Sequence, residues 1–234
     1  MKRQAVILAG GLATRMRPAT ETIAKSMLEV AGRPFVDWLL ERLVACGFDE
    51  VVLCVGRLGA QLRDHVGDGA RHGVFVRWSD EGDDARGTAG ALRLALPLLD
   101  ATFLLTYGDS YLPFDYASPL SMLASHDDAD GVMSVYPNAG RWDASNASTD
   151  GVWVRRYEKG ADDRSLDHID YGAIALRRDV VAALDDGHRG DLAPLFAALA
   201  AKNRLRASVA AERFFEIGSR EGLATLAQHL RPTS

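Results

Sequence analysis

Continuous apolar runs alternate with helically spaced apolar residues through the first half of the chain. Four runs have the composition of buried strands: residues 5–9, 50–55, 74–78 and 101–110. Three segments between them carry apolar side chains at helical spacing: residues 34–46, 58–66 and 87–99. This alternation predicts an α/β fold, a Rossmann-like doubly wound and mostly parallel mixed sheet flanked by helices.

The second half of the chain is more mixed in its pattern. Its apolar runs predict strands at residues 131–137, 151–159 and 172–177, with a polar loop at 138–150. Helical spacing returns at residues 179–185, 191–202 and 219–230. No linker rich in Pro, Gly or Ser separates the two halves, so we expect a single domain over residues 1–234.

Composition and charge narrow the classes of protein that the chain can belong to. Of its 234 residues, 47% are hydrophobic and 25% charged, which is typical of a globular protein. The net charge of −5 provides no basic field for nucleic acid, and no apolar run is long enough to span a membrane. Cys46 and Cys54 lack CxxC spacing and have the character of small core residues. We therefore expect a reduced, cytoplasmic protein with neither nucleic acid nor membrane as its partner.

Polar segments follow the first and the fourth predicted strand. Gly10–Arg17 comes after the first, and Gly108-Asp109-Ser110 comes after the fourth. In doubly wound sheets, ligands bind beyond the carboxyl ends of the strands. The first segment offers glycine amides, the Thr14 hydroxyl and basic side chains to an anion, although it has neither a Walker A nor a G-x-G-x-x-G spacing. The spacing alone leaves two interpretations open, a phosphate cradle and a basic turn.

A longer motif decides between them. Residues 8–43, LAGGLATRMRPATETIAKSMLEVAGRPFVDWLLERL, resemble the signature of sugar-1-phosphate nucleotidylyltransferases. The resemblance continues at residues 108–110, 158–159, 170–172 and 214–226. It implies the nucleotide-diphospho-sugar transferase type of fold, with a nucleotide-binding half at residues 1–110 and a sugar-phosphate-binding half at residues 111–234. The chain departs from the pattern at Ala13, where glycine is usual, at Ser26, where proline is common, and at Glu216, where many members carry aspartate.

The resemblance implies a role for each matching residue. The catalytic set is Arg15, Lys25, Asp109 and Lys159. Nucleotide binding falls to Leu8, Ala9, Gly10, Gly11, Thr14, Arg15, Lys25, Gly87 and Thr88. Sugar-phosphate binding falls to Ser110, Glu158, Lys159, Tyr171 and Gly172. Mg²⁺ is the implied cofactor, with Asp109 and Glu216 as its ligands, because Mg²⁺ takes one or two carboxylates together with phosphate oxygens.

The implied reaction is nucleotidyl transfer from an NTP to a sugar 1-phosphate, by in-line displacement of pyrophosphate. Within the family, residues 106–116, 141–146 and 168–180 are most similar to the heptose-1-phosphate and mannose-1-phosphate guanylyltransferases, which indicates GTP. Uridylyl, thymidylyl and cytidylyl transfer stay open as alternatives, as does a non-catalytic paralogue that binds nucleotide sugars. Association of the chain with copies of itself also stays open. A dinucleotide oxidoreductase is disfavoured because its fingerprint is missing.

Overall fold

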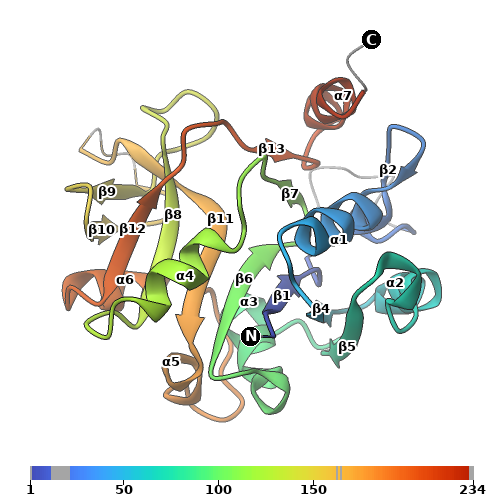
Figure 1. The fold of residues 1–234 in the computed structure, drawn as a ribbon, viewed down its shortest axis with the longest axis horizontal. Coiled ribbons are helices and arrows are strands. Elements are labelled where there is room, and N and C mark those ends of the chain that lie inside the picture. Colours follow the sequence, from blue (N-terminus) through green and yellow to red (C-terminus); the bar gives the residue numbers. More distant parts are fainter. Residues whose placement is uncertain (1, 12–21, 162, 164, 232–234) are drawn as a thin grey trace.

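A mixed sheet forms the centre of the molecule (Figure 1). The computed structural model describes all residues except 1, 12–21, 162, 164 and 232–234. Within the described residues the sheet has nine strands: β1 Gln4–Leu8, β4 Glu50–Val55, β5 Phe75–Asp80, β6 Thr102–Tyr107, β8 Gly131–Pro137, β9 Ala147–Thr149, β10 Val154–Tyr157, β11 His168–Arg177 and β12 Leu205–Val209. The strands β6, β1, β4 and β5 are neighbours in that order and run parallel.

β11 joins this parallel half to the rest of the sheet. It runs antiparallel to β6 on one side and to β8 on the other, and β8 then pairs in parallel with β12. Strands from both halves of the chain therefore share one sheet, which confirms the predicted doubly wound, mixed architecture. Two small sheets lie outside it: β2 Glu29–Val30 with β3 Arg33–Pro34, and β7 Ser110–Tyr111 with β13 Phe215–Glu216.

Helices cover both faces of the central sheet. On one face, an apolar core packs against three helices: α1 Phe35–Ala45, α2 Gly59–Val66 and α4 Ser118–Ala124. On the other face, a second core packs against α3 Gly87–Leu94, α5 Arg178–Ala182 and α6 Ala193–Ala201. The last helix, α7 Arg220–His229, lies beside β13 and β2 (Figure 1). Three short 3₁₀ turns complete the described elements: η3 Lys25–Met27, η4 Ala70–His72 and η5 Leu96–Leu98.

Most predicted elements are present, and the differences have local causes. The helix predicted over residues 87–99 ends at Leu94, because Pro97 cannot continue its hydrogen bonding and η5 follows. The predicted loop 138–150 contains strand β9, and helix α4 and strand β12 were not predicted. Among the described residues, no helix has the length and apolar character needed to cross a membrane.

Candidate active site

A cavity of about 350 Å³ opens at the carboxyl ends of the parallel strands. This volume lies within the range of small-molecule sites. Its lining includes seven residues that the sequence assigns to nucleotide binding: Leu8, Ala9, Gly10, Gly11, Lys25, Gly87 and Thr88. Asp109 also lines it. Thr14 and Arg15, which belong to the same prediction, lie outside the described residues.

Lys25 and Asp109 form an ion pair at this cavity. The Lys25 ammonium lies 2.6 Å from Oδ2 of Asp109, across 84 positions of the sequence. Both side chains are partly exposed, at 18% for Lys25 and 36% for Asp109. Each residue follows a strand of the parallel sheet, since β1 precedes the segment that leads to Lys25 and β6 ends at Tyr107. The pair therefore places a cation and a carboxylate together at the cavity.

The turn at Lys25 is fixed to the Asp109 loop by close packing. The Ser26 hydroxyl is buried and donates a hydrogen bond of 2.5 Å to the carbonyl of Gly108. A Cβ atom on Gly108 would lie 2.8 Å from Ser26 Oγ and 2.9 Å from Cβ of Ala9. Only glycine fits at position 108, and the serine at position 26 supplies a hydrogen bond that proline could not.

Strand pairing places Glu216 next to the same loop. In the small sheet of β7 and β13, Glu216 pairs with Ser110, and the amide of Ile217 donates to the carbonyl of Asp109 at 3.0 Å. A Cβ on Gly218 would lie 3.4 Å from the Lys25 ammonium and 3.9 Å from Oε2 of Glu216. The residues predicted as metal ligands are therefore held together by main-chain contacts between distant segments. Figure 1 shows β7 and β13 side by side beyond the end of β6.

Lys159 and Glu158 are not among the residues that line the cavity. The Lys159 ammonium lies 2.6 Å from Oδ2 of Asp191, and the Glu158 carboxylate contacts Arg156. Both residues follow strand β10 and are exposed. The structure thus places the predicted sugar-phosphate lysine in an ion pair that the sequence did not indicate.

The Tyr171 side chain lies in the apolar core and is not among the residues that line the cavity. Its assignment to sugar-phosphate binding stays a prediction. Its side chain is 2% exposed and packs in the core against the rings of Phe114 and Tyr136. Neighbouring residues of a strand point to opposite faces of the sheet. Asp170 accordingly points the other way, toward the hydroxyls of Tyr107 and Tyr157 at 3.4 Å each.

Asp170 is a carboxyl group with an unusual environment. Burial raises its pKa to about 6, against the opposing effect of the Gly172 amide, which donates to Oδ1 at 2.9 Å, and of the two tyrosine hydroxyls. Gly172 adopts a φ of +89°, which favours glycine. The positive charge of Lys159 also lowers the Asp170 pKa.

The family of the chain follows from comparison with known proteins. The model of the nucleotidyl transferase family matches residues 4–142. The chain belongs to the nucleotidyl transferase family. This match covers the strands, loops and turn that carry Lys25 and Asp109.

Its relatives differ in nucleotide and sugar. An N-acetylmuramate alpha-1-phosphate uridylyltransferase of Neisseria meningitidis is 41% identical over 123 residues, which are 52% of this chain and 53% of that protein. A mannose-1-phosphate guanylyltransferase of Mycobacterium tuberculosis is 28% identical over 184 residues, 78% of this chain and 51% of that protein. These matches span about half the length of each relative.

Solved structures share the whole fold. The complex of HddC from Yersinia pseudotuberculosis with GMP-PN has a TM-score of 0.78 and 24% identity, over 98% of this chain and 100% of the other. A glucose-1-phosphate thymidylyltransferase structure from Bacillus anthracis, described as putative in its own name, has a TM-score of 0.86 and 16% identity, over 100% and 98%. At such identities, the similarity shows the fold.

The carboxylates of Asp109 and Glu216 fit Mg²⁺ in their donor chemistry. Mg²⁺ keeps several waters and binds through one or two carboxylates together with substrate phosphates. Asp109 and Glu216 provide two carboxylates on adjacent main chains. In the part of the chain that the structure describes, no three His, Cys, Asp or Glu side chains gather as a metal site.

Glu81 is a residue of the cavity that the sequence analysis missed. It follows β5, and its Oε2 accepts a hydrogen bond from the Arg86 amide at 2.9 Å. A Cβ on Gly10 would lie 2.7 Å from its Oε1, so the carboxylate approaches the glycine loop closely. The rule that found Asp109, a polar residue at the carboxyl end of a parallel strand, identifies Glu81 too.

Gly87 and Gly90 are positions at which another segment packs closely on α3. A Cβ on Gly87 would lie 2.4 Å from the carbonyl oxygen of Gly190, and one on Gly90 would lie 2.5 Å from that of His188. These glycines therefore allow the loop before α6 to pack on α3, while Gly87 also lines the cavity.

Proposed function

We propose that the chain transfers a nucleotidyl group from an NTP to a sugar 1-phosphate. The observation that carries the proposal is the convergence of Lys25, Asp109 and Glu216 at one end of the parallel sheet. An oxygen of the sugar phosphate attacks the α-phosphorus, and the bond to pyrophosphate breaks. Two anions must meet in this step, so fixed positive charge lowers its barrier.

The residues divide this work between them. Lys25 neutralises phosphate charge at the cavity, while Asp109 and Glu216 would hold Mg²⁺, which supplies further positive charge to the triphosphate when bound. Arg15 is assigned to the departing pyrophosphate by family resemblance. Lys159 is assigned to the sugar phosphate on the same ground, and Glu158 to the sugar hydroxyls.

We propose GTP as the nucleotide, on the presence of Glu81 in the cavity. A carboxylate only accepts hydrogen bonds. Guanine presents two adjacent donors, N1–H and the N2 amino group, whereas uracil and thymine present one N–H between two carbonyl oxygens that a carboxylate repels. UTP is the alternative, and the relative that is 41% identical to this chain favours it by its name.

We propose a neutral sugar of the mannose or heptose type as the acceptor. The Asp191 carboxylate lies beside the Lys159 ammonium, which is assigned to the sugar phosphate. A carboxylate at this position disfavours an acceptor that carries its own carboxylate. N-acetylmuramate 1-phosphate is such an acceptor, so we expect it to be a poor substrate.

A substrate matrix tests the reaction and its specificity. Five NTPs are combined with the 1-phosphates of heptose, mannose, glucose and N-acetylmuramate, and pyrophosphate release is measured with Mg²⁺. Turnover in the GTP column with a neutral sugar is the expected result. A dominant UTP column contradicts the choice of base. No turnover in any combination contradicts the enzyme, and binding of nucleotide sugars without turnover then supports the regulatory paralogue.

Two variants, each with a control, test whether residues of the candidate site carry out the reaction measured in the substrate matrix. Asp109→Asn removes a metal carboxylate, and we expect pyrophosphate release to fall by at least about 100-fold while the fold is retained. Asp115→Asn is the matched control, because its carboxylate accepts from the Ala117 amide away from the cavity.

Glu81→Gln is expected to lower kcat/KM for GTP by about 10- to 100-fold relative to UTP. Asp83→Asn, an exposed change in the same loop, is its control.

A further inference from the structure

Residues 187–192, here the 187–192 loop, connect the nucleotide cavity to Lys159. The loop directly precedes α6 and packs on the first turn of α3. Its contacts on that side are main-chain hydrogen bonds: the Gly190 amide donates to the Arg86 carbonyl at 2.8 Å, and the Ala89 amide donates to the Gly190 carbonyl at 2.9 Å. These bonds fix the backbone of the loop relative to the wall of the cavity.

The Thr88 hydroxyl adds a third attachment. It accepts a hydrogen bond of 2.9 Å from the Leu192 amide, on the residue that follows Asp191. Thr88 also lines the cavity. A side chain of the cavity wall is thus bonded to the main chain directly beside Asp191.

The Asp191 carboxylate is oriented by both of its oxygens. Oδ1 accepts from the Ala193 amide at 2.8 Å, at the start of α6, and Oδ2 lies 2.6 Å from the Lys159 ammonium. A carboxylate that is held by the main chain in this way presents its second oxygen in a defined direction. Lys159 is 60% exposed, so without a partner its long side chain would sample many rotamers.

Asp191 also influences the tyrosines around Asp170. Its negative charge, together with burial as the main cause, contributes to the raised pKa of Tyr107 and of Tyr157. Tyr107 lines the nucleotide cavity. Asp191 thus contacts Lys159 and stands on a loop that is bonded to Thr88 in the wall of the cavity.

From these contacts we infer that Asp191 is a positioning residue for the nucleotidyl transfer, which places the Lys159 ammonium for the phosphate of the acceptor sugar. It does so through the 187–192 loop, whose attachment to α3 sets Lys159 relative to the bound nucleotide. The inference rests on the proposed function. It adds a residue that the family resemblance did not single out.

A double-mutant cycle tests the inference with the full chain. Lys159→Ala, Asp191→Asn and the double variant are assayed for pyrophosphate release with the best substrate pair of the matrix. We expect Asp191→Asn to lower kcat/KM for the sugar phosphate by about 10-fold, mainly through KM, and to leave the KM for the NTP unchanged. In the Lys159→Ala background, the same substitution is expected to have no further effect, because a positioning residue acts only through its partner.

Controls separate positioning from folding. Asp186→Asn removes another carboxylate just before the loop, one that pairs with Arg93, and is expected to keep the wild-type kinetics. Asp191→Glu keeps the charge and is expected to recover part of the lost kcat/KM. Equal losses from Asp191→Asn in both backgrounds, or no loss in either, overturn the inference. Absence of wild-type turnover is a different result and contradicts the proposed function instead.

Discussion

A single buried hydroxyl joins the two segments that carry Lys25 and Asp109. Ser26 is 2% exposed, and its hydrogen bond to the Gly108 carbonyl crosses 82 positions of the sequence. Removing the hydroxyl leaves that carbonyl buried without the Ser26 bond, which costs about 1–3 kcal/mol. A shift of the turn also moves the Lys25 ammonium relative to the carboxylate.

Ser26→Ala is therefore expected to lower both stability and activity. The free energy of unfolding should fall by about 1–3 kcal/mol in urea titrations, and kcat/KM by about 10-fold. Ser121→Ala is the control, since its hydroxyl donates to the Ala117 carbonyl at 3.1 Å on the exposed side of α4. Equal unfolding midpoints for the two variants would show that the Ser26 bond does not hold the loops.

Residue types at the site were predictable where they follow long strands. Asp109 follows β6, and the parallel pairing of β6 with β1 brings it close to the residues that follow β1. The Lys159–Asp191 pair was not predictable, because an ion pair between separate segments leaves no periodic pattern in the sequence. The core position of the Tyr171 side chain was not predictable from the match at residues 170–172, because a strand directs alternate side chains to opposite faces.

At the scale of elements, length decides what the sequence can predict. Strands β4 and β8 have the predicted bounds, since each is a mostly apolar run of six or seven residues. Strand β13 has two residues and exists through its pairing with β7, about a hundred positions away. Such a strand has no local signal. The sequence predicted Glu216 as a residue of the site. The pairing of β13 with β7, which holds Glu216 next to the Asp109 loop, is visible only in the structure.

Helix α7 supports the short strand that carries Glu216. A Cβ on Gly222 would lie 2.1 Å from the Glu216 carbonyl oxygen, so Gly222→Ala forces the helix and the strand apart. We expect a loss of about 1–3 kcal/mol in the free energy of unfolding from this overpacking. We also expect the Mg²⁺ concentration for half-maximal pyrophosphate release to rise, because Glu216 moves relative to Asp109.

Ala224→Ser, an exposed change on the same helix, is the control for Gly222→Ala. It is expected to change neither the unfolding midpoint nor the Mg²⁺ dependence. A Gly222→Ala protein with reduced stability and an unchanged Mg²⁺ dependence would contradict the role of β13 in the metal site. The two readouts therefore separate support of the fold from support of the site.

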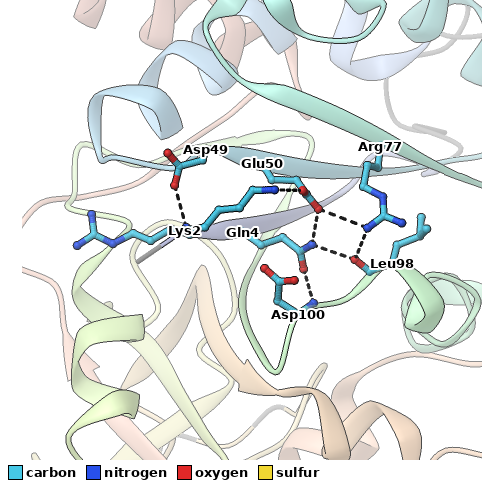
Figure 2. A network of polar contacts seen from close by, with 8 residues as sticks. Lys2, Gln4, Asp49, Glu50, Arg77, Leu98 and Asp100 are labelled. Atoms are coloured by element: carbon cyan, nitrogen blue, oxygen red, sulfur yellow. Dashed lines mark hydrogen bonds and ion pairs between the residues drawn. The ribbon is translucent and has the colours of Figure 1, made fainter.

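At the scale of the whole molecule, the carboxyl ends and the amino ends of the parallel strands carry different groups of polar residues. The carboxyl ends carry the candidate active site, and the amino ends are joined by a polar network around Glu50 (Figure 2). Glu50 is bonded to Lys2 at 2.6 Å and to the Gln4 amide at 2.7 Å. Gln4 in turn donates to the Leu98 carbonyl and accepts from the Asp100 amide. The network links β1 and β4 to the segment that enters β6.

The Glu50 network predicts a specific dependence of stability on pH. Burial acts to raise the Glu50 pKa, but the bonds from Lys2 and Gln4 and the charges of Lys2 and Arg77 outweigh it, so the pKa is lowered from 4.5. A carboxyl with a lowered pKa contributes stability above its unfolded-state pKa, and this stability is lost as the pH falls through the folded-state value.

Glu50→Gln should therefore lower the free energy of unfolding by about 1–3 kcal/mol at pH 7. The difference from wild type should shrink as urea titrations move below about pH 4.5, where Glu50 takes up a proton in the unfolded chain, and further as the pH falls through the lower folded-state pKa. Glu41→Gln, which removes a half-exposed pair with Arg33, should cost less than about 1 kcal/mol. A Glu50→Gln penalty that stays constant with pH would mean that the side chain stabilises the strands by packing rather than by its charge.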